Sequence, residues 1–153
     1  MSRAPFQVLV LPYVRAADGT PRYSVFRRAD LGVWQGIAGG GEEGETPDEA
    51  ARREAAEEAG VPADAPWTRL AAVGRVPASA FGPPAHWPAG LAEVPEYAFG
   101  VEVAPEAVVL SPEHDAVAWL PYAEAVVRLA WASNRAALVA LHARLHGTPV
   151  SGW

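Results

Sequence analysis

Eight of the 18 acidic residues of this 153-residue chain lie in one short segment. They are Glu42, Glu43, Glu45, Asp48, Glu49, Glu54, Glu57 and Glu58. Glu54, Glu57 and Glu58 are spaced three and four residues apart, so on a helix they share one face and repel one another by about 0.2–0.5 kcal/mol per pair. A divalent cation that prefers oxygen ligands would reverse this repulsion. The spacing therefore indicates a site for Mg²⁺ or Mn²⁺, although a solvated acidic surface explains the same run of charge.

The residues around these acids predict the helix that the spacing requires. Residues 46–49, Thr-Pro-Asp-Glu, supply an N-cap, a proline at the first helical position and the acid of a capping box. Gly60 can adopt the left-handed conformation that ends a helix, and Pro62 blocks its continuation. We therefore expect a helix from Thr46 to about Ala59, with small alanines on the face that packs against a sheet.

The segment from Gly39 to Val61 resembles the Nudix box. The seven fixed residues of that motif occur here in order and with its spacing: Gly39, Glu45, Arg53, Glu54, Glu57, Glu58 and Gly60. At about 7% usage for each fixed residue, a chance match at one starting position is of order 10⁻⁸. One departure is Ala55, where the family usually has a larger aliphatic residue, and it bears on how the helix packs. The resemblance implies an α/β fold, a Nudix-type α/β/α sandwich around a mixed β-sheet, and a hydrolase that uses Mg²⁺, with Mn²⁺ as the alternative.

The resemblance also implies roles for the residues of the box. Arg53, Glu54, Glu57 and Glu58 are expected to be catalytic, with the three glutamates as metal ligands. One of these glutamates, or a water that they hold, would serve as the general base. Arg53 precedes Glu57 by four residues, so its guanidinium can pair with a carboxylate and fix the rotamer. Glu45 is expected to be structural and to join the loop to the helix.

A further metal ligand is expected downstream, because Nudix proteins often add a carboxylate from outside the box. The candidates are Glu96, Glu102 and Glu113. We choose Glu113, since it lies in a loop just before a predicted strand, where its side chain can turn toward the site. An exposed loop acid without a role is the alternative.

Several short stretches outside the box resemble the bacterial dihydroneopterin triphosphate pyrophosphohydrolase branch of the family, once described as dATP pyrophosphohydrolase. They are residues 32–35, 111–114, 118–120 and 131–135. This resemblance implies a pyrophosphohydrolase that cleaves a pterin or (deoxy)nucleoside triphosphate to a monophosphate and pyrophosphate. Hydrolysis of another diphosphate, such as a dinucleoside polyphosphate or a nucleotide sugar, is one alternative. A non-catalytic Nudix module that binds a nucleotide is another.

Four residues are predicted to bind the substrate: Arg27, Trp34, Gln35 and Asn134. Trp34 could stack on the ring or simply fill the core, and Gln35 could form hydrogen bonds with the ring edge. Asn134 lies in the last of the resembling stretches. Arg27 and Arg28 alternate on a predicted strand, so at most one of them faces the phosphates.

The glycines of the box offer a competing interpretation. Gly39, Gly41 and Gly44 also match the glycine pattern of dinucleotide-binding loops. Such a loop brings a pyrophosphate onto the start of a helix, but here Glu42 and Glu43 lie inside the loop and would repel it. We therefore reject the Rossmann alternative.

The remaining elements are expected to form the scaffold of this site. A hairpin is predicted over residues 6–14 and 22–28, joined by a turn at Asp18-Gly19. Further strands are expected at residues 68–76, 97–103 and 116–120, and helices at 121–131 and 134–146. A long irregular loop over residues 77–95 is a candidate for a substrate lid or a variable insertion.

Composition excludes several classes of protein. All 12 basic residues are arginine and there is no cysteine, which excludes a Schiff-base enzyme and a disulfide scaffold. The net charge of −6 disfavours nucleic acid as a partner. No apolar run reaches the ~20 residues that a membrane helix needs. We expect a single cytoplasmic domain over residues 1–153 that acts on a small-molecule di- or triphosphate as a monomer or homodimer.

Overall fold

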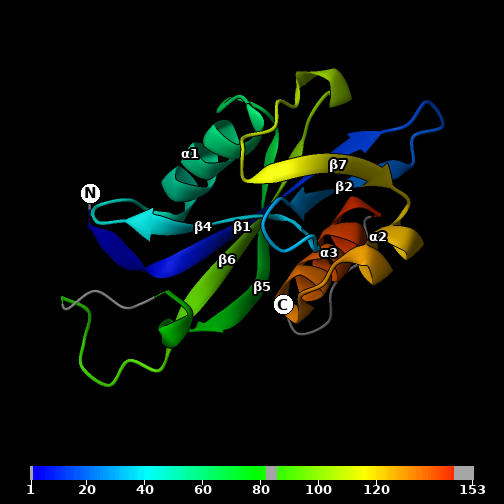
Figure 1. Ribbon diagram of the computed structural model, residues 1–153. Coiled ribbons are helices and arrows are strands. Elements are labelled where there is room, and N and C mark those ends of the chain that lie inside the picture. Colours follow the sequence, from blue (N-terminus) through cyan, green and yellow to red (C-terminus); the bar gives the residue numbers. More distant parts are fainter. Residues whose placement is uncertain (1, 82–85, 147–153) are drawn as a thin grey trace.

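The computed structural model describes residues 2–81 and 86–146, and a mixed β-sheet forms its middle layer (Figure 1). The strands are β1 (Arg3–Arg15), β2 (Pro21–Arg28), β3 (Trp34–Gln35), β4 (Ile37–Glu42), β5 (Trp67–Pro77), β6 (Glu93–Glu102) and β7 (His114–Leu120). The α-helices are α1 (Pro47–Ala59), α2 (Tyr122–Arg128) and α3 (Ala132–Leu145), and short 3₁₀ helices cover Ala78–Phe81 and Pro105–Ala107. None of the described helices is long and apolar enough to cross a membrane.

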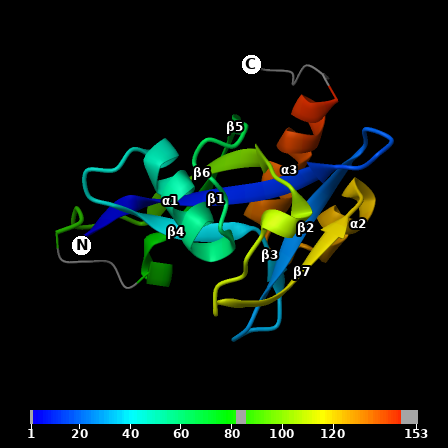
Figure 2. The same ribbon diagram turned by 90° about the horizontal axis from the view of Figure 1, so that it is seen from above.

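Strand β1 is the centre of the sheet, whose main order is β3-β2-β1-β6-β5. It runs parallel to β6 along one edge and antiparallel to β4 and β2 along the other. Strand β4 pairs with the first part of β1, whereas β2 pairs with its last residues, from Tyr13 to Arg15. Beyond that point β2 is flanked by β3 and by β7, which lies beside it in Figure 2. The two edges of β1 thus bring segments from all parts of the chain together.

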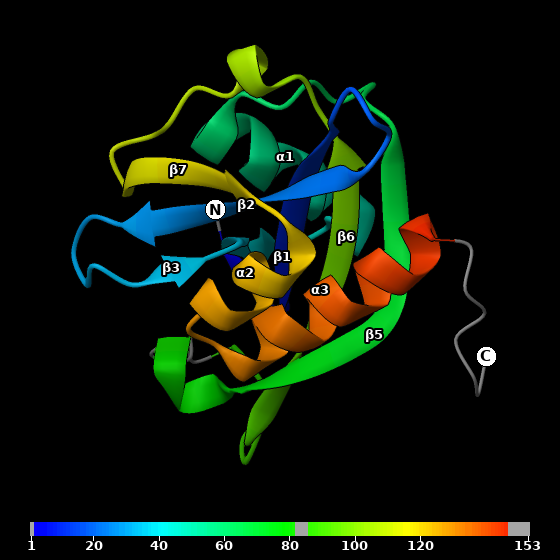
Figure 3. The same ribbon diagram turned by 90° about the vertical axis from the view of Figure 1, so that its right-hand side faces the viewer.

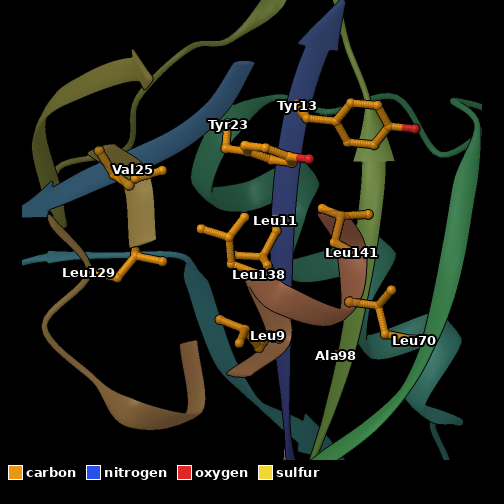
Figure 4. Close-up of a cluster of buried hydrophobic side chains, with 12 residues drawn as sticks. Leu9, Leu11, Tyr13, Tyr23, Val25, Leu70, Ala98, Leu129, Leu138 and Leu141 are labelled. Atoms are coloured by element: carbon orange, nitrogen blue, oxygen red, sulfur yellow. The ribbon is translucent and has the colours of Figure 1, made fainter. Parts of the chain in front are cut away.

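Helices cover both faces of the sheet, as Figure 3 shows with α2 and α3 in front and α1 behind. Side chains alternate along β1, because successive residues of a strand point to opposite faces. Val8 and Val10 pack against the alanines of α1, and Leu9 and Leu11 pack against α3. Figure 4 shows the cluster on the α3 side of the sheet, in which Leu138 and Leu141 of α3 pack against Leu9 and Leu11 of β1. The predicted α/β/α sandwich around a mixed sheet is confirmed.

Helix α1 begins and ends where the sequence predicts. The Thr46 hydroxyl accepts a hydrogen bond of 3.2 Å from the Glu49 backbone N–H, and the Glu49 side chain accepts one of 2.8 Å from the Thr46 N–H. Gly60 ends the helix with φ at 68°, a conformation that favours glycine. The capping box predicted from the sequence is therefore confirmed.

The predicted helix over residues 121–131 is too long. Helix α2 stops at Arg128, because Leu129 leaves the helical conformation and its side chain is buried in the core. The next residue, Ala130, donates its backbone N–H to the Trp34 carbonyl at 2.9 Å, which draws the chain toward β3. Tertiary contacts therefore override the helical pattern. Of the predicted loop over residues 77–95, positions 82–85 lie outside the described residues.

Candidate active site

Three carboxylates of α1 lie together at the surface of the sandwich. Glu54, Glu57 and Glu58 each offer an oxygen, and these oxygens lie within 4.8 Å of one another. Their surroundings differ, because Glu58 is only 8% exposed, Glu54 is partly buried and Glu57 is exposed. Burial raises the pKa of Glu54; the Arg53 guanidinium opposes this rise, and the charges of the other two glutamates add to it. A set of hard oxygen donors that repel one another in this way fits a divalent cation.

Gly39 of β4 allows this cluster to form. The first carboxylate, Glu54, lies so close to Gly39 that a Cβ atom at this position would collide with its carboxyl group. Glycine at this position therefore leaves the space that the Glu54 carboxyl group occupies in the cluster, rather than serving an unusual backbone conformation. This contact gives a physical reason for the glycine at the start of the box.

Arg53 ties the start of the box to the helix. Its Nε and Nη2 donate to the two carboxylate oxygens of Glu45 at 2.8 and 3.0 Å, and Nη2 also donates to the Gly40 carbonyl at 3.0 Å. Nη1 donates to Glu54 at 3.0 Å. The Arg53 guanidinium lowers the pKa of Glu45, which also accepts the Glu42 backbone N–H at 2.8 Å. Arg53 therefore holds the loop, the helix and one carboxylate of the cluster in a single arrangement.

The segment before β7 holds Glu58 from the other side. The Ser111 hydroxyl donates to Glu58 Oε2 at 2.6 Å, and His114 Nδ1 lies 3.7 Å from the same oxygen. Burial lowers the pKa of His114. The same segment carries Glu113, whose pKa is raised by partial burial and then by the Glu58 charge. The structure thus places Glu113 beside Glu58, although it does not belong to the group of three whose ligand atoms lie within 4.8 Å.

A cavity of about 550 Å³ adjoins this cluster and is lined by several strands and the start of α3. Its polar lining includes Gln7, Gln35, Glu96, Glu113, Trp131 and Asn134. Glu113 is common to both regions, since it lines the cavity and lies beside Glu58. A molecule with a ring in the cavity can therefore extend its other end toward the carboxylates.

Two of the four predicted substrate-binding residues line the cavity. The Gln35 amide oxygen accepts a hydrogen bond of 2.9 Å from Trp131 Nε1, and the Asn134 amide oxygen accepts one of 2.8 Å from the Gly36 backbone N–H. Both side chains are buried. These bonds fix the orientation of each amide, because only its oxygen can accept.

Trp34 and Arg27 do not line this cavity. Trp34 packs against the core cluster on the α3 side, with the Arg128 guanidinium 5.4 Å from its ring. Arg27 pairs with Asp115 at 3.5 Å, whereas its neighbour Arg28 lines the cavity. Neighbouring residues on a strand face opposite sides of the sheet. When Gln35 and Arg28 face the cavity, Trp34 and Arg27 therefore point away from it.

Gln7 and Trp131 are among the cavity residues that the sequence did not single out, and the roles predicted for the acids of the box stay predictions. Gln7 of β1 donates its Nε2 to Glu96 Oε2 of β6 at 2.7 Å, a contact between residues 89 positions apart that no local pattern could indicate. Glu96 was a candidate metal ligand, but it lines the cavity and is only 3% exposed. Trp131 lies in one of the stretches that resemble the pterin branch, and this resemblance is the sequence signal that could have identified it as a cavity residue. Glu102, the remaining candidate, pairs with Arg15 at 3.8 Å.

An α/β/α sandwich that presents a glycine loop, a capped helix and clustered carboxylates defines a class of enzyme that the sequence comparisons confirm. The NUDIX domain model matches residues 7–141, so the chain belongs to the Nudix family. The predicted enzyme class, a hydrolase of phosphoric anhydride bonds, is confirmed. A search of curated proteins found no match.

Solved structures show the same relationship. A protein from Listeria monocytogenes described as a Nudix hydrolase is 33% identical, with a TM-score of 0.82, and covers 96% of this chain and 100% of its own. The E. coli dihydroneopterin triphosphate pyrophosphohydrolase is 25% identical, with a TM-score of 0.73, and covers 90% of this chain and 94% of its own. A C. elegans Ap4A hydrolase shares the fold at 22% identity, with a TM-score of 0.70, and covers 94% and 99%. The pterin enzyme is therefore one of several similar Nudix structures.

Proposed function

We propose that this chain is a Mg²⁺-dependent pyrophosphohydrolase of a pterin or (deoxy)nucleoside triphosphate, with dihydroneopterin triphosphate as the favoured substrate. The products would be a monophosphate and pyrophosphate. One observation carries the proposal: a cluster of three carboxylates lies next to a cavity of about 550 Å³, with Glu113 in contact with both. The similarity to the E. coli pterin enzyme supports the choice of substrate.

Glu54, Glu57 and Glu58 would hold the metal, with Glu113 as a further ligand. Divalent ions at such a site offset the repulsion between carboxylates and phosphates, polarise phosphorus and lower the pKa of bound water. Arg53 orients Glu54, and Ser111 orients Glu58. One of the glutamates, or a water that they hold, takes the proton from the attacking water.

The cavity would take the ring of the substrate. Trp131 is 43% exposed and lines the cavity, so its ring is available for stacking. Gln35 and Asn134 are positioned by their own hydrogen bonds to meet the ring edge. Arg28 and Arg75 both line the cavity and can face the phosphates, and the Arg28 guanidinium also donates to Asp30 at 2.9 and 2.6 Å.

A substrate screen tests this proposal. Purified protein with Mg²⁺ is given dihydroneopterin triphosphate, ATP, dATP, GTP, a dinucleoside polyphosphate and a nucleotide sugar, and pyrophosphate and orthophosphate are measured separately. We expect pyrophosphate as the first product, with kcat/KM for dihydroneopterin triphosphate at least about tenfold above that for ATP and dATP, or about 1.4 kcal/mol. Orthophosphate as the first product, or a faster reaction with the dinucleotide or the nucleotide sugar, would contradict it.

A further inference from the structure

Glu96 stands out among the acids of the chain because it is buried and still lines the cavity. Its side chain is 3% exposed, and Oε2 accepts the hydrogen bond from Gln7 at 2.7 Å. Oε1 forms no hydrogen bond within residues 2–81 and 86–146, and it is not one of the fully enclosed unpaired atoms of these residues, so it keeps access to the cavity. A buried carboxylate is costly unless its oxygens have partners. Glu96 therefore presents an acceptor that a bound ligand could satisfy.

Gly74 of β5 lies close to Glu96 Oε1 and to the start of α3. Gly74 of β5 has no side chain, and a Cβ atom there would lie 3.5 Å from Glu96 Oε1 and 3.2 Å from Ser133 Cβ. Glu96 and Ser133 both line the cavity. A larger residue at position 74 would narrow the space between this oxygen and the first turn of α3.

The side-chain amides of Gln35 and Asn134 also line the cavity, and their oxygens already accept hydrogen bonds. The amide oxygens of Gln35 and Asn134 are already used, by Trp131 and by the Gly36 backbone. The Gln35 Nε2 group forms no hydrogen bond to any other residue that the structure describes. The cavity therefore offers a carboxylate acceptor at Glu96 and an amide donor at Gln35.

We infer that Glu96, held in place by Gln7, selects substrates whose ring presents an N–H and an adjacent amino group beside a carbonyl. This is the 2-amino-4-oxopyrimidine edge that guanine and pterin rings share. The carboxylate can accept from both donors, and the Gln35 amide can donate to the ring carbonyl. An adenine ring instead turns the lone pair of a ring nitrogen toward the carboxylate, and hypoxanthine lacks the amino group. The inference rests on the proposed function and makes Glu96 a specificity-determining residue of it.

The test compares GTP with ITP, which differ only in the 2-amino group, and follows kcat/KM with Mg²⁺ in wild-type protein and in Glu96→Gln. We expect the wild-type protein to prefer GTP at least about tenfold, because ITP keeps the ring N–H but lacks the 2-amino group, so the carboxylate loses one of its two hydrogen bonds to the ring. In Glu96→Gln the ratio should fall to within about twofold, mainly through a lower rate with GTP. Dihydroneopterin triphosphate is tested separately. If pterin and guanine share the site, Glu96→Gln should lower kcat/KM for dihydroneopterin triphosphate by the same factor as for GTP.

Glu102→Gln is the matched control, because it makes the same chemical change on the same strand at a half-buried residue outside the cavity. It should leave the GTP-to-ITP ratio unchanged. An equal loss for GTP and ITP in Glu96→Gln would show a merely structural role and overturn the inference. If Glu96→Gln does not fold, the wild-type ratio decides: a ratio within twofold overturns the inference, and a tenfold preference supports it.

Calorimetric binding of GMP and IMP to the wild-type protein separates this inference from the proposed function. If no triphosphate is hydrolysed, the proposed function fails, but the ring site is still tested by these monophosphates. We expect GMP to bind at least about tenfold more tightly than IMP. Equal affinities would overturn the inference even if triphosphates are hydrolysed.

Discussion

The carboxylate cluster and the cavity are built in different ways, although they lie side by side. The cluster comes from three residues of one helix, and the residues that position it belong largely to the same short segment, such as Glu45 and Arg53. The cavity is assembled from strands and a helix that are distant in the sequence, and its Gln7–Glu96 contact spans 89 positions. Under the proposed function, the cluster would hold the metal that activates water and phosphate, and the cavity would select the ring of the substrate.

The largest expected effect is on the cluster. Glu58→Gln keeps the shape of the side chain but removes its charge, so kcat should fall at least about 100-fold, or about 2.7 kcal/mol. Excess EDTA should abolish hydrolysis by wild-type protein, and Mg²⁺ should raise its melting temperature. Pyrophosphate release and thermal denaturation measure these effects.

Glu124→Gln is the control for that experiment, because Glu124 is an exposed acid of α2 outside both regions. Its activity should match the wild-type protein. A Glu58→Gln protein that keeps more than about a tenth of wild-type kcat, a loss under 1.4 kcal/mol, would argue against its role as a ligand. So would full turnover in excess chelator.

Trp131 and Trp34 test whether the substrate ring binds in the cavity. Trp131→Ala should raise KM for the triphosphate about tenfold, since a stacking contact is worth about 1–3 kcal/mol, and should change kcat much less. Trp34→Ala should instead lower the free energy of unfolding by about 1–3 kcal/mol, because Trp34 packs against the core cluster. Steady-state kinetics and chemical denaturation of both variants distinguish the two roles. The reverse pattern, with a larger KM effect at Trp34, would place the ring elsewhere.

Arg53 tests how far the cluster depends on its local support. Arg53→Lys keeps the positive charge but cannot reproduce the paired hydrogen bonds to Glu45, so kcat should fall about three- to tenfold and the free energy of unfolding by about 1–2 kcal/mol. The neighbouring Arg52→Lys is the control, since Arg52 lies on the same helix but its contacts are outside the cluster: it pairs with Asp48 at 3.9 Å and its guanidinium lies 5.2 Å from the Trp67 ring. Both are measured by kinetics and denaturation. Equal behaviour of the two variants would show that Arg53 does not orient the cluster.

The smallest expected effect concerns the helical layer away from the cluster. His142 of α3 stacks on Tyr122 at 3.8 Å and lies 2.8 Å from the Tyr23 hydroxyl, and burial followed by the nearby His146 lowers its pKa. The folded protein therefore binds this proton less readily than the unfolded chain. Its contribution to stability is complete above the unfolded value of about 6.5 and declines as the pH falls through the lower folded pKa.

Melting temperatures at pH 7.5 and pH 5.5 check this expectation in wild-type protein and in His142→Gln. The wild-type melting temperature should fall between the two values, and the variant should show a smaller fall. The comparison within each protein removes the cost of losing the Tyr122 stack, because that cost is present at both values. An unchanged difference in the variant would assign the pH dependence to other groups.

The part of the site that follows local rules could be predicted from the sequence. A capping box, a glycine C-cap and glutamates spaced three and four residues apart fix the ends of α1 and the face on which its carboxylates lie, because helix geometry relates near neighbours. The strand and helix pattern also predicted most of the scaffold elements, whereas the α/β/α layers were expected from the resemblance to the Nudix family. It overestimated the length of α2, where the burial of Leu129 ends the helix.

The residue of each neighbouring pair that faces the cavity depends on how the strands pair in the folded sheet. The sequence shows that Arg27 and Arg28, or Trp34 and Gln35, must point in opposite directions, but strand alternation does not say which one points inward. That choice depends on how β2 and β3 pair with β1 and β7, and it places Arg28 and Gln35 in the cavity. The partnership of Gln7 with Glu96 likewise exists only because β1 and β6 are parallel neighbours, in a register set by the packing of the whole sheet.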